Sequence, residues 1–419
     1  MKLLLTGYCG RSHSIIEKLE TDPRVDRIFW APGNAGKVSS KVQNVPIRAT
    51  DGAGLVRFTR ENAVDLTIVS QNFAIYEGVG NTFRDAKLPV FGPTREMAAL
   101  EWDKVWAKDF FVKHGISSPT HRLLTDPEEI SAYARSVELP TVVKYGGLAY
   151  GGGVFLCDTR EEVLDAVSQI TNSEIRAVSG SDEAVIFEQF VTGREVSMHF
   201  MADGEHSVFV GDARDYKRAE DGDSGANTAG MGSYTPTGFV TPEHVRQVQE
   251  QIIEPTLAGM QDQGTPYRGV LYAGVIFTDR GPMLLEFNCR FGDSECQALM
   301  GRLDANLLDL FLAEDLDGMR VGFKNTSCVT VVMCTAGYPA DAGVQEHVVH
   351  GLDDVDPDIS VYHYGTKRVG GEIVTPTGRV LSVTANGDTR EAAAERVYAN
   401  TGRISWEGVR YRTDVGRLV

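Results

Sequence analysis

The sequence predicts a multidomain protein of mixed α/β and α+β class, with a parallel α/β domain first and a β-rich domain last. Its 419 residues exceed the length of one ordinary domain. Residues 1–100 alternate short apolar runs with helical stretches, the pattern of a parallel sheet with crossover helices. Farther along, strand-like runs dominate and glycine becomes frequent, so the fold class changes along the chain.

The N-terminal domain is predicted from four buried apolar runs, Lys2–Thr6, Arg27–Trp30, Asp65–Val69 and Pro89–Phe91. Helical patterns lie between them over Ser14–Glu20 and Gly54–Asn62. The turn Gly7–Gly10 closes the first strand, at the edge where parallel sheets bind ligands.

The middle of the chain begins with a charged helix predicted over Ala98–His114. Strands follow it, over Pro140–Tyr145, Ala184–Phe190, Glu195–Met201, Ser207–Val210, Tyr272–Phe277 and Pro282–Asn288. Thr278–Gly281 joins the last two as a hairpin turn. An acidic segment follows Ala313, and from Cys328 a last block of strands is expected to run to the C-terminus.

Composition excludes several classes of partner. The formal net charge of -17 opposes nucleic-acid binding, which needs a basic surface. No apolar run reaches the roughly 18 residues of a membrane span, so neither nucleic acid nor membrane is expected as a partner. The six cysteines show no CxxC pair, which favours free thiols and a cytoplasmic location.

The strongest chemical signal is the strand that ends at Glu286-Phe287-Asn288, followed by Arg290 and Asp293. Residues two apart on a strand share a face, so Glu286 and Asn288 project together, while Leu285 and Phe287 should face a core. A carboxylate and an amide oxygen are hard ligands suited to Mg²⁺. A solvated edge strand is the structural alternative.

A glycine-rich loop gives the second signal. The predicted strand that ends at Lys144 is followed by five glycines within residues 146–153. Backbone N–H groups of such a loop converge on an anion, and the lysine adds a point charge for a phosphate. The loop matches neither the Walker nor the GxGxxG pattern, and a plain flexible hairpin is the alternative.

Two further segments are weaker signals. The two strands on either side of Phe190 offer this ring to a flat heterocycle, and Glu195 could accept hydrogen bonds from two ribose hydroxyls. Asp215-Tyr216-Lys217-Arg218 precedes a glycine- and asparagine-rich stretch over 221–232 that predicts an ordered loop, not a helix. Lys217 and Arg218 suit an anionic intermediate, although an ordinary surface loop fits the pattern equally well.

Together these segments resemble the ATP-grasp enzymes and, more narrowly, the phosphoribosylamine–glycine ligase family. The likeness covers nearly the whole chain and includes Ala31–Gly36, Asp65–Val69, Phe91–Thr94, Asn227–Gly232, Leu271–Gly274, Glu286–Asp293, Gly337–Pro339, His363–Lys367 and Gly378–Leu381. The resemblance implies an ATP-grasp fold with ATP between two antiparallel sheets. It implies an N-terminal substrate domain (1–100), a small lid subdomain (101–190), a large subdomain with the metal site (191–325) and a C-terminal β-rich domain (326–419).

The resemblance also implies a role for each candidate residue. The nucleotide-binding set is Lys104, Lys144, Gly151, Gly152, Gly153, Glu188, Phe190 and Glu195. The metal ligands, for Mg²⁺ or Mn²⁺, are Glu286 and Asn288. The catalytic set is Arg290, Lys217, Arg218 and Asp293. The substrate pocket is formed by Arg11, Ser12, His13, Gln71, Asn72, Asp215 and Asn227. A carboxylate would attack the γ-phosphate of ATP, and an amine would then displace phosphate from the acyl phosphate.

Two N-terminal loops depart from the family pattern. The family's Gly-Asn-Gly-Gly-Arg-Glu-His is Gly7–His13 here, with Cys9 and Ser12 in place of a glycine and the glutamate. The family's Gly-Pro-Glu is Ser70-Gln71-Asn72 here, directly after the apolar run Asp65–Val69. Two carboxylates are lost, and Tyr8 and Phe73 are added. We therefore expect a different and less polar amine, although drift without a change of substrate is the alternative.

The lid loop differs too. Gly146 stands where the family has Asp, and Gly152 where it has Lys, so one cation near the phosphates is missing. The loss of this cation predicts slower turnover or altered lid closure. The metal pair and Arg290 are still present.

Three functional hypotheses remain. The leading one is a ligase that activates glycine or another small amino acid and joins it to an amine other than phosphoribosylamine. The alternative is an ordinary phosphoribosylamine–glycine ligase of purine biosynthesis, and the second alternative is a catalytically silent nucleotide-binding homologue. The partners would be small-molecule carboxylate and amine substrates, and the chain would be a monomer or homodimer. A dehydrogenase is disfavoured because Gly7–Gly10 lacks the required glycine spacing.

Overall fold

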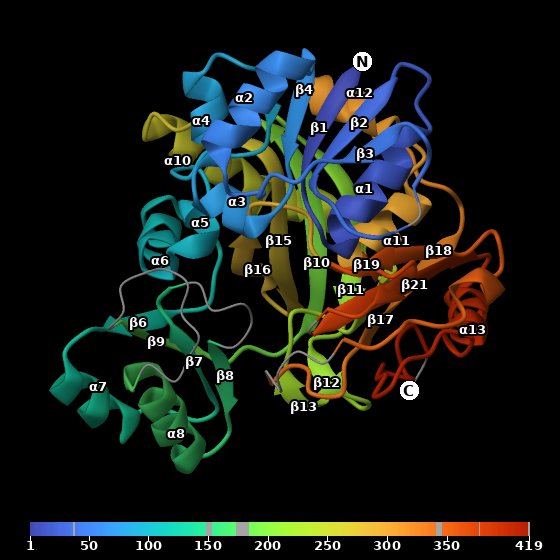
Figure 1. Cartoon of the computed structure of the whole chain (residues 1–419). Helices are drawn as coiled ribbons and strands as arrows, with labels where there is room; N and C mark the ends of the chain where they lie inside the picture. The colour runs from blue at the N-terminus through green and yellow to red at the C-terminus, as the bar shows by residue number, and fades with distance from the viewer. Residues whose placement is uncertain (37, 148–152, 173–183, 341–345, 377, 418–419) are drawn as a thin grey trace.

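The computed structural model describes residues 1–36, 38–147, 153–172, 184–340, 346–376 and 378–417. Figure 1 shows an N-terminal sheet with its helices, a small lid that extends to one side, and a large sheet shared by the middle and end of the chain. The predicted mixed α/β and α+β fold is confirmed. Within the described ranges, every helix is too short or too polar to span a bilayer. All six cysteines are buried and free, as expected.

The N-terminal sheet has the strand order β3-β2-β1-β4-β5, and its strands run parallel. They are β1 (Lys2–Gly7), β2 (Arg27–Pro32), β3 (Val42–Asn44), β4 (Leu66–Val69) and β5 (Val90–Phe91). The helices are α1 (Gly10–Glu20), α2 (Gly52–Asn62), α3 (Asn72–Tyr76) and α4 (Val79–Asp85). The four predicted strands are confirmed; the pattern misses β3 because its sequence has no apolar run.

The lid contains a four-stranded antiparallel sheet of order β6-β9-β7-β8. Its strands are β6 (His121–Leu124), β7 (Thr141–Tyr145), β8 (Val154–Cys157) and β9 (Val185–Gln189), covered by α7 (Pro127–Ala134) and α8 (Arg160–Thr171). The single helix predicted over Ala98–His114 is wrong, because α5 (Ala99–Trp102) and α6 (Lys104–Lys113) are separate. Asp103 divides them and caps α6 by accepting from the Trp106 backbone N–H at 3.0 Å.

The large sheet has the order β16-β15-β10-β11-β14-β17-β21-β18 and its paired strands are antiparallel. Its strands are β10 (Arg194–Asp203), β11 (Ser207–Asp215), β14 (Gly232–Thr235), β15 (Arg268–Thr278), β16 (Gly281–Asn288), β17 (Ser327–Cys334), β18 (Ser360–His363) and β21 (Arg379–Gly387). It crosses the expected boundary between residues 325 and 326. Its helices are α9 (Pro242–Val248), the π-helix η1 (Gln249–Ile253), α10 (Glu254–Asp262), α11 (Glu295–Arg302) and α12 (Leu307–Leu312).

The remaining elements are two short ribbons, a 3₁₀ turn and a C-terminal helix. The ribbons pair β12 (Arg218–Glu220) with β13 (Ser224–Asn227), and β19 (Lys367–Val369) with β20 (Glu372–Val374); the turn is η2 (Leu352–Asp354). The stretch 221–232 is not helical, as expected, but β13 lies within it. The expectation of strands to the C-terminus is wrong, because α13 (Arg390–Thr401) packs on β17 and β21. Ala393, Ala394 and Val397 form its buried face.

One apolar core joins the N-terminal sheet to the large sheet. Leu4 of β1, Phe200 of β10 and Leu271 of β15 belong to the same buried cluster. Burial of this shared surface stabilises the contact between the two regions. The carboxyl ends of the parallel strands are therefore held in a fixed position near β16.

Candidate active site

The expected metal-ligand strand β16 lies at the edge of the large sheet. Glu286 pairs with Gly274 of β15, and Asn288 pairs with Tyr272. Directly paired residues of antiparallel strands point to the same face, so Glu286 and Asn288 share a face with Tyr272 and with Ser197, the β10 partner of Gly274. This face carries polar side chains, as predicted for the pair.

A β-bulge corrects one part of that prediction. The register of β15 and β16 shifts between Gly274 and Val275, so Leu285 has no direct partner. Leu284 and Phe287 are buried, whereas Leu285 is only half-buried, so the core-facing role predicted for Leu285 is wrong. The Leu285 carbonyl instead accepts from Lys144 Nζ at 3.5 Å, where the lid meets the large sheet.

Four cations surround Glu286. Burial alone would raise the pKa of this carboxyl, but Lys217, Lys144, Lys104 and Arg290 outweigh burial and hold the pKa below its ordinary value. The nearest, Lys217 Nζ, lies 3.6 Å from Glu286 Oε1. A carboxylate that stays charged, beside the amide oxygen of Asn288, is a donor set that fits Mg²⁺.

Arg290 is held by a residue that the sequence pattern does not reveal. Its guanidinium lies 3.1 Å from Glu101 Oε1 and donates to Asn288 Oδ1 at 2.7 Å. Glu101 Oε2 also accepts from the Cys289 backbone N–H at 2.7 Å. Glu101 therefore fixes both the guanidinium and the end of β16, although it lies 188 positions away from Cys289.

The contacts continue into the N-terminal loops. Asn72 donates to Glu101 Oε1 at 3.0 Å and accepts from Arg11 at 3.0 Å, while Arg11 also donates to the Phe291 carbonyl at 2.9 Å. A cavity of about 20 Å³ lies beside Arg11 and Arg290, enough for one water. The structure thus brings Arg11, Asn72 and Arg290 together around Glu101.

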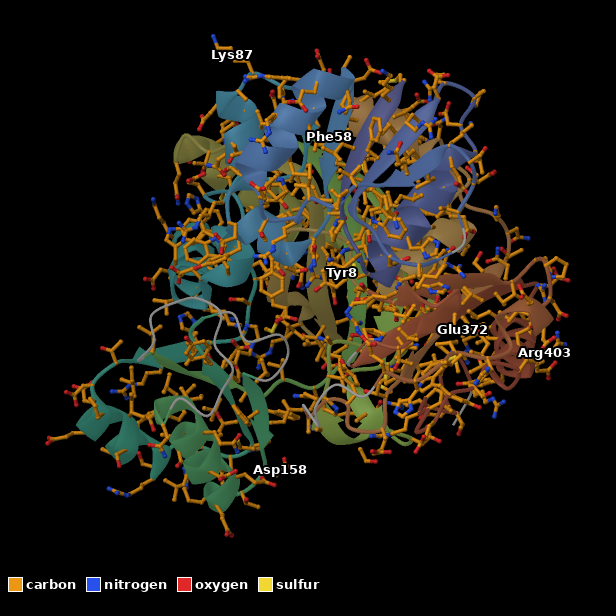
Figure 2. All side chains as sticks on the ribbon, viewed as in Figure 1. Tyr8, Phe58, Lys87, Asp158, Glu372 and Arg403 are labelled. Atoms are coloured by element: carbon orange, nitrogen blue, oxygen red, sulfur yellow. The ribbon has the colours of Figure 1, made fainter. Side chains whose placement is uncertain are left out.

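Other expected pocket residues are buried in contacts within the N-terminal domain or between it and the C-terminal region. Ser12 is fully buried, and its hydroxyl donates to the Cys9 carbonyl at 2.8 Å. His13 is buried and accepts from the His363 backbone N–H at 3.1 Å. Gln71 is buried. Tyr8 lies centrally in Figure 2, and its carbonyl accepts from the Gly365 N–H at 2.8 Å.

Lysines from the lid and α6 gather opposite β16. Lys104 donates to the Gly147 carbonyl, and burial together with the Lys144 charge lowers its pKa to about 8. Lys144 on β7 lies 2.8 Å from Glu188 on β9, and Lys108 on α6 lies 2.6 Å from the same carboxylate. Glu188 was expected in the nucleotide-binding set, and two lysines bind its carboxylate. Lys108 is absent from the predicted set, although its position one turn after Lys104 is a usable signal.

The rest of the expected nucleotide set is more scattered. Phe190 is half-buried just after β9, and Glu195 is exposed on β10. The Gly153 carbonyl accepts from the Tyr145 N–H at 2.8 Å and so closes the β7–β8 pair. Gly151 and Gly152 lie outside the described residues. Asn227, expected in the substrate pocket, donates to the Val154 carbonyl at 3.0 Å and so joins β13 to the lid.

Asp215 and Lys217 lie at the end of β11, beside the polar face. Burial and the Glu295 charge raise the pKa of Asp215 to about 8, against the opposing effect of Lys217. Lys217 approaches Glu286, as already described. Arg218 turns away and donates to the Gly225 carbonyl at 2.9 Å within its own ribbon, so it is not brought to Glu286.

The C-terminal region contributes to the same site through Asp293. This carboxylate accepts from the Tyr364 hydroxyl at 2.6 Å and from Gln297 at 2.8 Å. Arg379 of β21 donates to the Asp293 carbonyl at 2.6 Å. Burial would raise the pKa of Asp293, but the Arg379 and Arg11 charges dominate and lower it to about 2. Asp293 is therefore a buried anchor between three regions.

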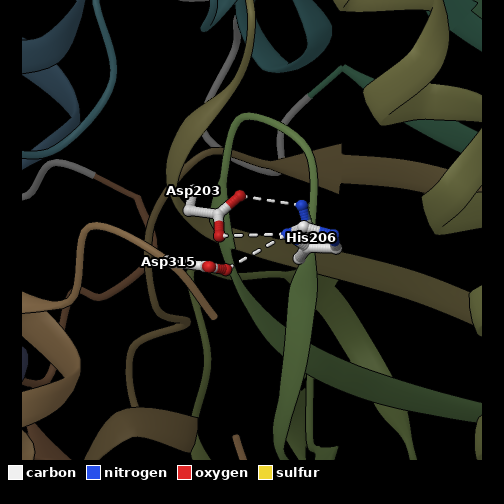
Figure 3. Close-up of side chains that lie close together, drawn as sticks. All are labelled: Asp203, His206 and Asp315. Carbon is white, nitrogen blue, oxygen red and sulfur yellow. Dashed lines mark hydrogen bonds and ion pairs between the residues drawn. The ribbon is translucent and has the colours of Figure 1, made fainter. Parts of the chain in front are cut away.

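A second cluster of possible metal-ligating groups, Asp203, His206 and Asp315, lies elsewhere (Figure 3). Asp203 already accepts from three backbone N–H groups, those of Glu205, His206 and Leu316, at 2.6–2.9 Å. Its carboxylate thus fixes the β10–β11 turn, and His206 Nδ1 lies 3.3 Å from the exposed Asp315. These contacts describe a structural turn.

Charged side chains gathered between a small lid sheet and a large sheet, with a hard-ligand pair on the edge strand and an arginine just after it, are the arrangement of an ATP-grasp ligase. The chain matches three descriptions of one family in order: the phosphoribosylglycinamide synthetase N domain over 1–101, its ATP-grasp (A) domain over 102–296 and its C domain over 328–418. The chain belongs to the phosphoribosylglycinamide synthetase family. It is an ATP-dependent, ADP-forming carboxylate–amine ligase.

Individual relatives agree with this assignment. The chain is 41% identical to the phosphoribosylamine–glycine ligase of Vibrio parahaemolyticus, covering 99% of this chain and 98% of the relative. It is 38% identical to the enzyme of the same name from Rhizobium meliloti over the same shares. The crystal structure of Thermotoga maritima phosphoribosylamine–glycine ligase superposes with a TM-score of 0.82 at 28% identity, covering 99% of this chain and all of that one.

A more distant structure shares the fold alone. The biotin carboxylase domain of Hydrogenobacter thermophilus 2-oxoglutarate carboxylase, solved with MgADP, superposes with a TM-score of 0.69 at 14% identity, covering 98% of this chain and 91% of that one.

Proposed function

We propose that the chain joins glycine to phosphoribosylamine and converts ATP to ADP and phosphate. The amide would form in two steps. A carboxylate oxygen of glycine attacks the γ-phosphorus, and the bond to the β–γ bridging oxygen breaks to release ADP. The amine nitrogen then attacks the acyl carbon, the bond to the phosphate oxygen breaks, and the amine loses a proton.

The described residues supply binding and charge rather than a nucleophile. Arg290, held by Glu101, binds the glycine carboxylate and then the acyl phosphate. Lys104 and Lys144 bind the phosphates of ATP. Glu286 and Asn288 would hold Mg²⁺, which when bound offsets negative charge on the transferred phosphoryl group.

The observation that carries the proposal is the continuous set of contacts from Arg11 through Asn72 and Glu101 to Arg290. It connects the N-terminal loops, where the amine would bind, to the arginine that handles the acid. The relatives that match the chain along its whole length carry the name of this reaction. They favour the ordinary ligase over the changed-amine hypothesis.

The test is to incubate the purified full chain with ATP, Mg²⁺, glycine and phosphoribosylamine and to measure both ADP and glycinamide ribonucleotide. We expect one ADP for each product molecule and no product when glycine is omitted. Arg290→Met should abolish product, whereas the exposed Arg280→Met in the β15–β16 turn should not. Failure to form glycinamide ribonucleotide would reject the proposal.

A changed amine is the second candidate, favoured by the side chains at the N-terminal loops. Tyr8 and Phe73 are 40% and 38% exposed there, so aromatic surface is presented beside Asn72. The Cys9 side chain occupies the start of α1 and makes no capping hydrogen bond. A panel of apolar primary amines, tested with ATP and glycine, decides: an amine with a higher kcat/KM than phosphoribosylamine would support this candidate.

A further inference from the structure

Three buried charged side chains from three elements form one cluster beside the expected nucleotide site. Glu188 Oε1 lies 2.8 Å from Lys144 Nζ, and Glu188 Oε2 lies 2.6 Å from Lys108 Nζ. The side chains of Lys108, Lys144 and Glu188 are 4%, 8% and 2% exposed, so water screens none of the three. Each carboxylate oxygen is thus matched to one lysine.

Lys108 reaches this cluster from α6, one helical turn after Lys104. Residues four apart on a helix share a face, so both lysines of α6 point to the lid. Lys104 donates to the carbonyl of Gly147, just after β7, while Lys108 lies against β9. Lys104 and Lys108 of α6 therefore contact different residues of the lid.

The cluster carries a net positive charge because two lysines share one carboxylate. Burial alone would raise the pKa of Glu188, but the charges of Lys144 and Lys108 outweigh it and keep the pKa below its ordinary value. His121, the β6 neighbour of Glu188, adds no charge at neutral pH, because burial and Lys108 lower its pKa. Without Lys108, Lys144 and Glu188 would form a neutral pair.

We propose that Lys108 is a positioning residue that neutralises Glu188, so that Lys144 keeps a net positive charge for the phosphates of the nucleotide. Lys108 itself is too deeply buried to bind solvent-borne phosphate without moving. The inference rests on the ATP dependence of the ligase. It changes the role expected of Glu188 as well: its carboxylate pairs with both lysines.

The test compares two probes, MgADP and adenosine, by titration calorimetry on the full chain. Lys108→Met should weaken MgADP binding at least about 10-fold, which is about 1.4 kcal/mol, because one buried charge is lost from the phosphate site. The affinity for adenosine should not change, because adenosine carries no phosphate. The exposed Lys113→Met at the end of the same helix is the matched control and should bind both probes as the wild type does.

Two further variants separate charge from structure. Lys108→Met combined with Glu188→Gln should restore MgADP affinity to within about 3-fold of the wild type, because Lys144 is again an unneutralised cation. Glu188→Gln alone should bind MgADP as tightly as the wild type or more tightly. If Lys108→Met fails to fold, the MgADP affinity of Glu188→Gln still tests the inference.

Several outcomes would overturn the inference. Equal losses of MgADP and adenosine in Lys108→Met would show a purely structural role, and unchanged MgADP binding would show no role. A large loss of MgADP affinity in Glu188→Gln would mean that Glu188 contacts the nucleotide directly. A wild-type protein that binds neither probe would reject the ATP dependence itself, a different failure from a variant that binds normally.

Discussion

Glu101 lies against Arg290, with its Oε1 3.1 Å from the guanidinium and its Oε2 bonded to the backbone N–H that precedes this arginine. Both side chains are largely buried, at 9% and 16% exposure. A helix near the start of the lid thereby sets the orientation of a side chain at the end of β16. Acid-substrate binding should depend on this pair.

Glu101→Gln should lower kcat/KM for glycine about 10- to 100-fold, about 1.4–2.7 kcal/mol, because a charged hydrogen-bond partner of Arg290 is lost. The KM for ATP should change little, since the lysines of the nucleotide site are intact. Steady-state kinetics with each substrate varied in turn measures both. The exposed Glu96→Gln is the matched control. An equal loss of ATP and glycine affinity would contradict the prediction.

Glu286→Gln should raise the Mg²⁺ concentration needed for half-maximal rate by about 10-fold or more, because a charged oxygen ligand becomes neutral. The measurement is the initial rate against Mg²⁺ at fixed ATP. Asp279→Asn, in the turn of the same hairpin, removes a carboxylate far along the strand and should leave the curve unchanged. Coincident curves for Glu286→Gln and the wild type would rule out a metal role.

Lys104 should make nucleotide binding sensitive to alkaline pH. Its pKa in the folded protein is about 8, lowered by burial from 10.5, and the phosphates bind its protonated form. The ATP affinity is therefore full below about pH 8 and is lost as pH rises above this pKa, by up to about 10-fold per pH unit. Lys104→Arg stays charged throughout, so its KM for ATP should remain flat. Parallel pH profiles of the two proteins would refute the role.

Tyr364→Phe should destabilise the protein, because the buried Asp293 loses a hydroxyl donor at 2.6 Å. The Gln297 bond to Asp293 remains, and losing one hydrogen bond to a charged group costs about 1.5–3 kcal/mol, which corresponds to a fall of a few °C in Tm. Thermal unfolding measures the change. Tyr411→Phe, at a half-buried tyrosine of the C-terminal region, should unfold like the wild type. A Tyr364→Phe protein with wild-type Tm would show that Asp293 does not need this bond.

The sequence allowed correct prediction of features that local pattern determines. Alternation on β16 predicts that Glu286 and Asn288 share a face, although the bulge at Leu285 falls outside any alternation rule. Glu101 was not predictable in the same way, and Lys108 offers only its spacing from Lys104, because the partners of both are brought to them by the packing of α5 and α6 on other regions. Helix α13 is missed because only runs of β-branched residues count as evidence of structure there. Its signals are the capping Thr389 and the small buried alanines of the helix.

The large sheet has a consequence for any attempt to shorten the chain. β17 lies between β14 and β21, and its Val331 and Cys328 pair with Gly232 and Thr235. A fragment that ended near residue 326 would expose the edge of β14 that now pairs with β17, with its N–H and C=O groups unpaired. Such an open edge recruits other chains, so this fragment should aggregate rather than work as a smaller ligase.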